Sequence, residues 1–428
     1  MKLLFTIFFF SVTLLHANIQ LIKKGNKDSN TTLLVIAGIH GNEPGGYFAA
    51  SILATNYNIT SKNLWIVPNL NKESIRKNKR GVNGDMNRKF SHIKHSDGDK
   101  QILEEIKKVI LSKNVSLVLN LHDGHGFYRK KHQGSIFNPN AWGQTCVIDQ
   151  CDLKTSQPFG SLNDIAISVK NSINKKLLKK HHSFDVKNTN TKYDDEAMQL
   201  SLTYFAVTNN KPAFAIETSK NLSNLTQKVF YQLLAIEEYM KIMGIKYERD
   251  FDLNEKNLKV IIHNYGTLSI NNNILLNLCD IKKSLSYIPI KSTGNIFKFS
   301  HPLGDFKKIR GNYVISIGNK RITTLKPQYF RLAQNCSQNM KFIVDNKKKL
   351  FKAASDFYVD ADFKVIKNKD QRVNIIGYQP IRKMDESEIR ISLNNLNKNY
   401  SVDKKNKIYR VEFYKKDEFC SMYMVHFK

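Results

Sequence analysis

The sequence predicts an α/β domain around a parallel or mixed sheet, followed by two small, mostly β domains. Between residues 30 and 245, short apolar runs alternate with apolar stripes at helical spacing, as in strands buried between helices. After about residue 250 the helical stripes largely vanish and strand-like runs follow one another. A chain of 428 residues has the length of two or three domains.

The elements of the first domain are predicted from two periodicities. Continuous apolar runs predict buried strands at residues 33–37, 64–67, 115–121 and 213–216. Apolar residues three and four apart predict helices that begin at Pro44 and cover 102–110 and 229–243. Proline is tolerated in a first helical turn, and Gly244 is a plausible cap for the last helix.

The remaining chain is predicted to be strands. The runs lie at residues 260–262, 274–276, 313–317, 322–325, 363–366, 373–376, 409–413 and 422–427, with Gly318-Asn319 as a hairpin turn between two of them. We place the domains at 18–248, 249–340 and 341–428. An immunoglobulin-like sandwich is one candidate for the last.

Residues 1–17 have the features of a secretory signal peptide. Lys2 supplies a positive charge, residues 3–15 are mostly apolar, and Ala17 is a small residue at the end. The run is short for a membrane span, and no later stretch approaches 18 apolar residues. We therefore expect a periplasmic protein without a stable membrane span; an uncleaved amino-terminal anchor is the alternative.

The net charge favours a polyanionic partner. The chain has 67 Lys and Arg against 37 Asp and Glu, which gives +30. A genome biased toward Lys, Asn and Ile would produce the same charge without any partner. Because export separates the protein from nucleic acid, we expect no nucleic-acid partner and an acidic envelope polymer instead.

The five cysteines allow one specific expectation. Cys146 and Cys151 have four residues between them and could close a small disulfide loop in an oxidising compartment. The pairing of Cys279, Cys336 and Cys420 cannot be read from sequence. No Cys-x-x-Cys pair is present, so a thiolate zinc site is unsupported.

Three residues at strand ends are candidate metal ligands. His40 and Glu43 lie three apart in a glycine-rich loop after the strand 33–37, and His122 follows the strand 115–121. Ligands bind at the carboxyl ends of such strands. A His/Glu/His set leaves the fourth position open, as catalytic zinc requires. A hydrogen-bonded strand-end histidine is the alternative for His122.

Further charged residues are candidates for binding and catalysis. Guanidinium groups bind carboxylates and stabilise developing oxyanions, and Arg80 and Arg88 lie eight apart with Asn87 beside the second. The alternative is a solvated basic loop. Glu217 follows the apolar strand 213–216, where a carboxylate could take a proton from water and pass it to a leaving amine. A glutamate at the rim of the sheet is the alternative.

The order and spacing of these motifs resemble the zinc metallocarboxypeptidase family, which includes digestive carboxypeptidases and, more distantly, aspartoacylases. The resemblance covers roughly residues 25–245. It implies a mixed sheet of about eight strands flanked by helices. It also implies one zinc ion per chain, bound by His40, Glu43 and His122.

The same resemblance assigns the other roles. Glu217 matches the general base, and Arg80 matches the residue that polarises the scissile carbonyl. Asn87 and Arg88 match the clamp on the terminal carboxylate of the substrate. The tyrosine that digestive carboxypeptidases use near the substrate has no clear match.

Three residues are candidates for the wall of the pocket. Tyr204 lies thirteen residues before Glu217, but the adjacent Thr203 is an equally good candidate for the pocket wall. Trp142 is a third candidate, although a lone tryptophan is more often part of a core.

The whole architecture is similar to the periplasmic peptidoglycan DL-carboxypeptidases of helical epsilon-proteobacteria, which trim the murein tripeptide to a dipeptide and influence cell shape. Some of those have Gln where this chain has His40. The similarity implies muropeptide substrates. We expect the β domains to hold the enzyme against the wall or against a partner, such as other cell-wall enzymes or scaffolds. Two alternatives stay open: an aspartoacylase-like deacylase of small N-acyl amino acids, and a non-catalytic wall-binding protein.

Overall fold

The computed structural model describes residues 19–26, 29–153, 158–379 and 384–428. The predicted signal peptide, residues 1–17, lies outside these ranges. Within them, no helix has both the length and the apolar character that crossing a membrane requires.

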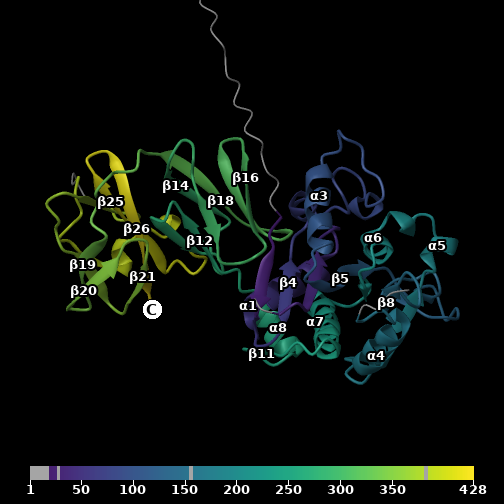
Figure 1. Ribbon diagram of the computed structural model, residues 1–428. Coiled ribbons are helices and arrows are strands. Elements are labelled where there is room, and N and C mark those ends of the chain that lie inside the picture. Colours follow the sequence, from purple (N-terminus) through teal and green to yellow (C-terminus); the bar gives the residue numbers. More distant parts are fainter. Residues whose placement is uncertain (1–18, 27–28, 154–157, 380–383) are drawn as a thin grey trace, which may run out of the picture.

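The first part of the chain builds a mixed sheet with helices on both faces (Figure 1). In spatial order its strands are β1 (Ile22–Gly25), β4 (Asn63–Val67), β2 (Thr32–Ala37), β5 (Val115–Gly124), β10 (Ala213–Ser219), β8 (Thr145–Ile148) and β9 (Asp185–Asn188). The four central strands from β4 to β10 are parallel, whereas β1 and β8 pair antiparallel with their inner neighbours. The α/β prediction is confirmed, with seven strands among the described residues where the resemblance implied about eight.

The helices cover the sheet from two sides. In Figure 1, α3 and α6 lie on one side of the sheet and α4 and α7 on the other. The bounds are α1 (Pro44–Asn56), α2 (Lys72–Arg76), α3 (Lys100–Ile110), α4 (Leu162–Asn174), α5 (Thr191–Asp194), α6 (Leu202–Thr208) and α7 (Leu225–Ile242). Two short pairs complete this part: β3 (Tyr57–Ile59) with β11 (Tyr247–Arg249), and β6 (Phe127–Tyr128) with β7 (Phe137–Asn138).

One predicted strand is wrong. Residues 260–262 belong to a helix, α8 (Glu255–Ile262), which Asn254 caps by accepting a hydrogen bond from the Asn257 amide at 2.9 Å. Leu258 and Ile262, four residues apart, are buried, while Val260 is 70% exposed. The apolar run is therefore the end of an amphipathic helix and not a two-sided buried strand.

Four sheets follow α8. The first two are β13-β12-β15 and β14-β18-β17-β16, from the strands β12 (Thr267–Ile270), β13 (Ile274–Asn277), β14 (Ser284–Ile290), β15 (Phe297–Phe299), β16 (Gly304–Ile309), β17 (Asn312–Ile317) and β18 (Lys320–Tyr329). The other two are β20-β19-β22-β24 and β21-β26-β25-β23, from the strands β19 (Asn339–Val344), β20 (Lys347–Lys352), β21 (Asp356–Val359), β22 (Asp362–Val365), β23 (Arg372–Ile375), β24 (Arg390–Ser392), β25 (Ile408–Lys415) and β26 (Glu418–Phe427). The predicted change to strands is confirmed, and the last two sheets enclose a core of their own.

The disulfide expectation is also wrong. The bond joins Cys336 to Cys420, which are 84 residues apart, and Cys146 and Cys151 are free thiols. Cys146 lies inside β8 and its side chain is buried in the core, whereas Cys151 is exposed after the strand ends. Because one side chain faces the core and the other faces solvent, proximity in sequence does not bring the two sulfurs together.

Candidate active site

The sheet positions three candidate ligands at its carboxyl edge. His40 follows β2, and Glu43 precedes α1, which begins with Pro44 in its first turn. The helix approaches β5 so closely that a Cβ atom on Gly46 would lie 2.9 Å from the Leu121 carbonyl oxygen. This close approach, which only glycine permits, brings Glu43 next to His122 at the end of β5.

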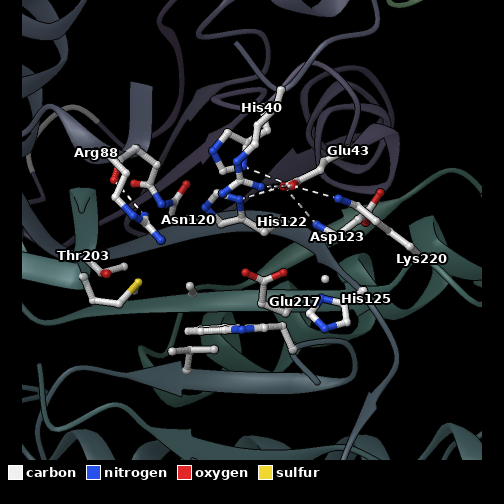
Figure 2. Close-up of a pocket in the computed structure, with 17 residues that line it drawn as sticks. His40, Glu43, Arg88, Asn120, His122, Asp123, His125, Thr203, Glu217 and Lys220 are labelled. Atoms are coloured by element: carbon white, nitrogen blue, oxygen red, sulfur yellow. Dashed lines mark hydrogen bonds and ion pairs between the residues drawn. The ribbon is translucent and has the colours of Figure 1, made fainter. Parts of the chain in front are cut away.

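The three residues form one buried cluster (Figure 2). Each offers a ligand atom, and these atoms lie within 4.8 Å of one another. The Glu43 carboxylate lies 2.8 Å from His122 Nδ1 and 3.1 Å from His40 Nδ1. Within the described part of the chain, His122 Nε2 is buried without a hydrogen-bond partner, and His40 Nδ1 is in ion-pair contact with Glu43 but makes no hydrogen bond of good geometry. Buried, unsatisfied imidazole nitrogens beside a carboxylate are what a metal ion would satisfy, so these residues fit a metal ion.

The electrostatics of the cluster favour charged Glu43 and neutral His122. Burial opposes ionisation of Glu43, but His40 and His122 outweigh it and hold the pKa of the carboxyl well below its usual range. Burial, reinforced by the charges of His40 and Arg80, lowers the pKa of His122. An ionised carboxylate and a neutral imidazole are the forms that bind metal.

Glu217 lines the same pocket and lies just below these residues in the view of Figure 2. It is on β10, directly beside His122 in the parallel register of β10 and β5. Burial, together with the carboxylates of Glu43 and Asp123, raises the pKa of Glu217 well above its ordinary value. A carboxylate whose proton affinity is raised can act as a proton acceptor and donor near neutral pH.

The loop 80–90 brings the other predicted residues to the same pocket. Arg80, Asn87 and Arg88 line it, and the last two belong to a short 3₁₀ helix, Met86–Arg88. The Asn87 carboxamide oxygen accepts a hydrogen bond of 3.0 Å from the Leu202 backbone amide. Its amide nitrogen is therefore the group that Asn87 can offer to a carboxylate.

The candidate wall residues separate into two groups. Trp142 and Thr203 line the pocket, and the Lys187 ammonium lies 4.5 Å from the centroid of the Trp142 ring. The side chain of Tyr204 instead packs against the hydrophobic core. The pocket has a volume of about 240 Å³.

Among the charged residues of the site, Asp85 and Lys220 were assigned no role from the sequence. Asp85 lies between Arg80 and Asn87 in the sequence and was given no role there; its carboxylate lies 2.7 Å from His40 Nε2 and 2.8 Å from Arg80 Nε. Lys220 places its ammonium 3.3 Å from Glu43 Oε1. Asp85 could have been found from its place two residues before Asn87, whereas nothing in the sequence marks Lys220.

Arg80 is held by carboxylates on both sides. Its Nε contacts Asp85, and its Nη1 lies 3.3 Å from Glu43 Oε1. The guanidinium is about half exposed to the pocket, with a relative exposure of 47%. It can therefore face a bound substrate while remaining fixed.

Comparison with known proteins gives consistent matches over nearly the whole chain. Residues 1–263 match the family described as the catalytic part of a carboxypeptidase controlling helical cell shape, and residues 333–428 match the C-terminal domain of metallo-carboxypeptidase. No curated protein sequence matches the chain.

Solved structures of one Helicobacter pylori protein are similar to this chain. The apo and tripeptide-bound forms of its cell shape determinant Csd4 each match with 32% identity and a TM-score of 0.89, covering 96% of this chain and 100% of theirs. The mDAP-bound form, described as a D,L-carboxypeptidase, matches with 32% identity and a TM-score of 0.90, covering 95% of this chain and 100% of its own.

Proposed function

The chain belongs to the family of carboxypeptidases that control helical cell shape, and we propose that it is a zinc-dependent DL-carboxypeptidase of peptidoglycan. It trims the stem tripeptide to a dipeptide by cleaving the bond between D-glutamate and meso-diaminopimelate, and thereby influences cell shape. The observation that carries this proposal is the single pocket lined by His40, Glu43, His122, Glu217 and Arg88.

One zinc ion per chain would be held by His40, Glu43 and His122. When bound, zinc supplies a Lewis acid for the scissile carbonyl and lowers the pKa of water. Asp85 accepts a hydrogen bond from the Nε2–H of His40, which fixes the tautomer and leaves Nδ1 as the ligand atom.

Glu217 transfers a proton from water to the leaving amine. Its carboxylate takes a proton from the attacking water and then donates it to the nitrogen of the leaving amine. Burial and the neighbouring carboxylates raise the pKa of Glu217, which favours its acceptance of the proton from water. Arg80 stabilises the negative charge that develops on the carbonyl oxygen, since its guanidinium is already held in place by Glu43 and Asp85.

Asn87 and Arg88 bind the free carboxylate of the terminal residue. A guanidinium and an amide nitrogen on adjacent residues hold a carboxylate in one orientation. This contact places the last peptide bond beside the metal ligands and excludes internal bonds. Trp142 and Thr203 complete the wall for the terminal diamino acid.

The location follows from the substrate. A signal peptide at residues 1–17 would export the protein to the periplasm, where its muropeptide substrates are found. The charge of +30 would attract the acidic wall, and the β domains are the candidate surface for the wall or for other cell-wall proteins.

The test is digestion of a purified murein tripeptide, with mass analysis of the products. The wild-type protein should release diaminopimelate and leave the dipeptide, while the tripeptide with a carboxamide-blocked terminus should be a poor substrate. Arg88→Ala should lose most activity. Arg88→Lys keeps the charge but not the planar guanidinium that binds a carboxylate through two hydrogen bonds, so it should retain only part of the activity. Equal cleavage of the free and blocked tripeptides would contradict the proposal.

A further inference from the structure

The first β unit, β12 to β18, packs against the catalytic sheet. Its buried residues belong to the same hydrophobic core as those of α1 and β4, while the last two sheets enclose a separate core. Figure 1 shows β16 and β18 between the catalytic sheet and the last two sheets. This unit is therefore positioned to support the active site.

One contact lies beside the helix that follows Glu43. Gly318, in the turn between β17 and β18, has a φ of +56°, and a Cβ atom there would lie 3.2 Å from the Tyr47 ring and 3.5 Å from the Phe48 ring. The Lys320 ammonium lies 5.5 Å from the centroid of the Phe48 ring. The turn thus packs tightly on the first turns of α1.

A second contact holds α2. Asp305 on β16 accepts a hydrogen bond from Arg76 Nη1 at 2.7 Å, and the two side chains are 26% and 19% exposed. Beyond the helix, the Asn319 amide donates to the Asn78 side-chain oxygen at 3.2 Å. A short charge-assisted bond between partly buried groups is stronger than an ordinary surface ion pair.

The segment held in this way leads directly into the site. α2 has five residues, which is too few for a stable isolated helix. Four residues after Arg76, Arg80 meets Glu43 and Asp85. In the segment between Arg76 and Arg80, the Lys79 carbonyl oxygen accepts a hydrogen bond of 2.9 Å from the Gly41 amide, next to His40.

We infer that Asp305 is a positioning residue for catalysis: from β16 it fixes, through Arg76 on α2, the backbone segment that delivers Arg80 to the active site. The inference rests on the proposed function, in which Arg80 acts on the transition state. A displacement of about 1 Å in a catalytic group costs on the order of 100-fold in rate. Loss of this support should therefore lower kcat more than it raises KM.

The experiment uses Asp305→Asn in the full chain, with kcat and KM measured on the murein tripeptide. We expect kcat to fall about tenfold or more and KM to stay within about twofold. Asp362→Asn is the matched control, because it removes the carboxylate of an ion pair with Arg390 (3.0 Å) in the sheet β20-β19-β22-β24. The control should keep its kcat; an equal loss in both variants would overturn the inference.

A double-mutant cycle with Arg80→Ala tests whether Asp305 acts on catalysis through Arg80. If Asp305 acts through Arg80, Asp305→Asn should change the single-turnover rate by less than about twofold once Arg80 is removed. The same loss with and without Arg80 would overturn the inference.

Amide hydrogen exchange gives a readout that does not depend on activity. Exchange over residues 72–82 should accelerate in Asp305→Asn and remain normal in Asp362→Asn; unchanged exchange would also overturn the inference. Failure of the wild-type protein to cleave the tripeptide would reject the proposed function instead.

Discussion

Asp85 joins a candidate metal ligand to a candidate catalytic arginine, so its removal should weaken both. The perturbation is Asp85→Asn, which keeps the size of the side chain but removes its charge. The wild-type carboxylate makes two charge-assisted contacts, 2.7 Å to His40 Nε2 and 2.8 Å to Arg80 Nε. Such bonds contribute about 1.5–3 kcal/mol each.

The expected magnitude follows from those contacts. Loss of one such bond corresponds to roughly a factor of ten or more, and replacement of a residue that orients a metal ligand typically costs about 10–100-fold in metal affinity or activity. We therefore expect Asp85→Asn to bind zinc about 10–100-fold more weakly. Its kcat at saturating zinc should also be reduced, because Arg80 loses one of its two carboxylate partners.

The assay is competition for zinc against a chromophoric chelator, followed by tripeptide kinetics with excess zinc. Asp97→Asn is the control, since Asp97 pairs with Lys89 at 2.8 Å in the same part of the chain and is absent from the pocket wall. Zinc affinity within about twofold of the wild-type value in Asp85→Asn would refute the reasoning.

Four further predictions follow from the structure. His122→Ala should lose zinc and activity, because one of three protein ligands is removed; stoichiometric zinc in the purified variant would contradict this. Glu217→Gln should lower kcat by about two orders of magnitude or more while zinc content stays normal; near-normal turnover would assign the base elsewhere. Binding to isolated sacculi should weaken as salt is added, since exposed charges are screened beyond about 10 Å at 0.1 M; salt-independent binding would favour a specific pocket. Burial raises the pKa of Glu386 from 4.5 to about 7, so its neutral form stabilises the folded state at low pH and that contribution is lost as pH rises toward 7. Glu386→Gln should therefore melt progressively higher relative to the wild type between pH 4.5 and 7, and a pH-independent difference in Tm would contradict the assignment.

The local sequence pattern was sufficient for the parts of the fold that depend on local physics. Apolar runs predicted the central strands β2, β4, β5 and β10, because a strand covered on both faces must be apolar throughout. The same runs located the site. The carboxyl ends of parallel strands meet at one edge of a sheet, so residues at or just beyond those ends, such as His122 and His40, come together.

The pattern was insufficient where a short element depends on its neighbours. β8 and β9 have four residues each and were not predicted, because such short runs carry too little periodicity to be distinguished from loops. The run at 260–262 was assigned to a strand because three apolar residues fit either period. Packing of α8 against the core decided the matter.

Tertiary structure alone decided the contacts between residues far apart in sequence. The Cys336–Cys420 bond spans 84 residues, and the contact between Arg76 and Asp305 spans 229. Periodicity and spacing describe which face of an element is buried, but they contain no information on which distant side chain meets it there. The ligands could be predicted because the sheet brings strand ends together in every protein of this class, whereas the contact from β16 to α2 depends on how this particular β unit packs.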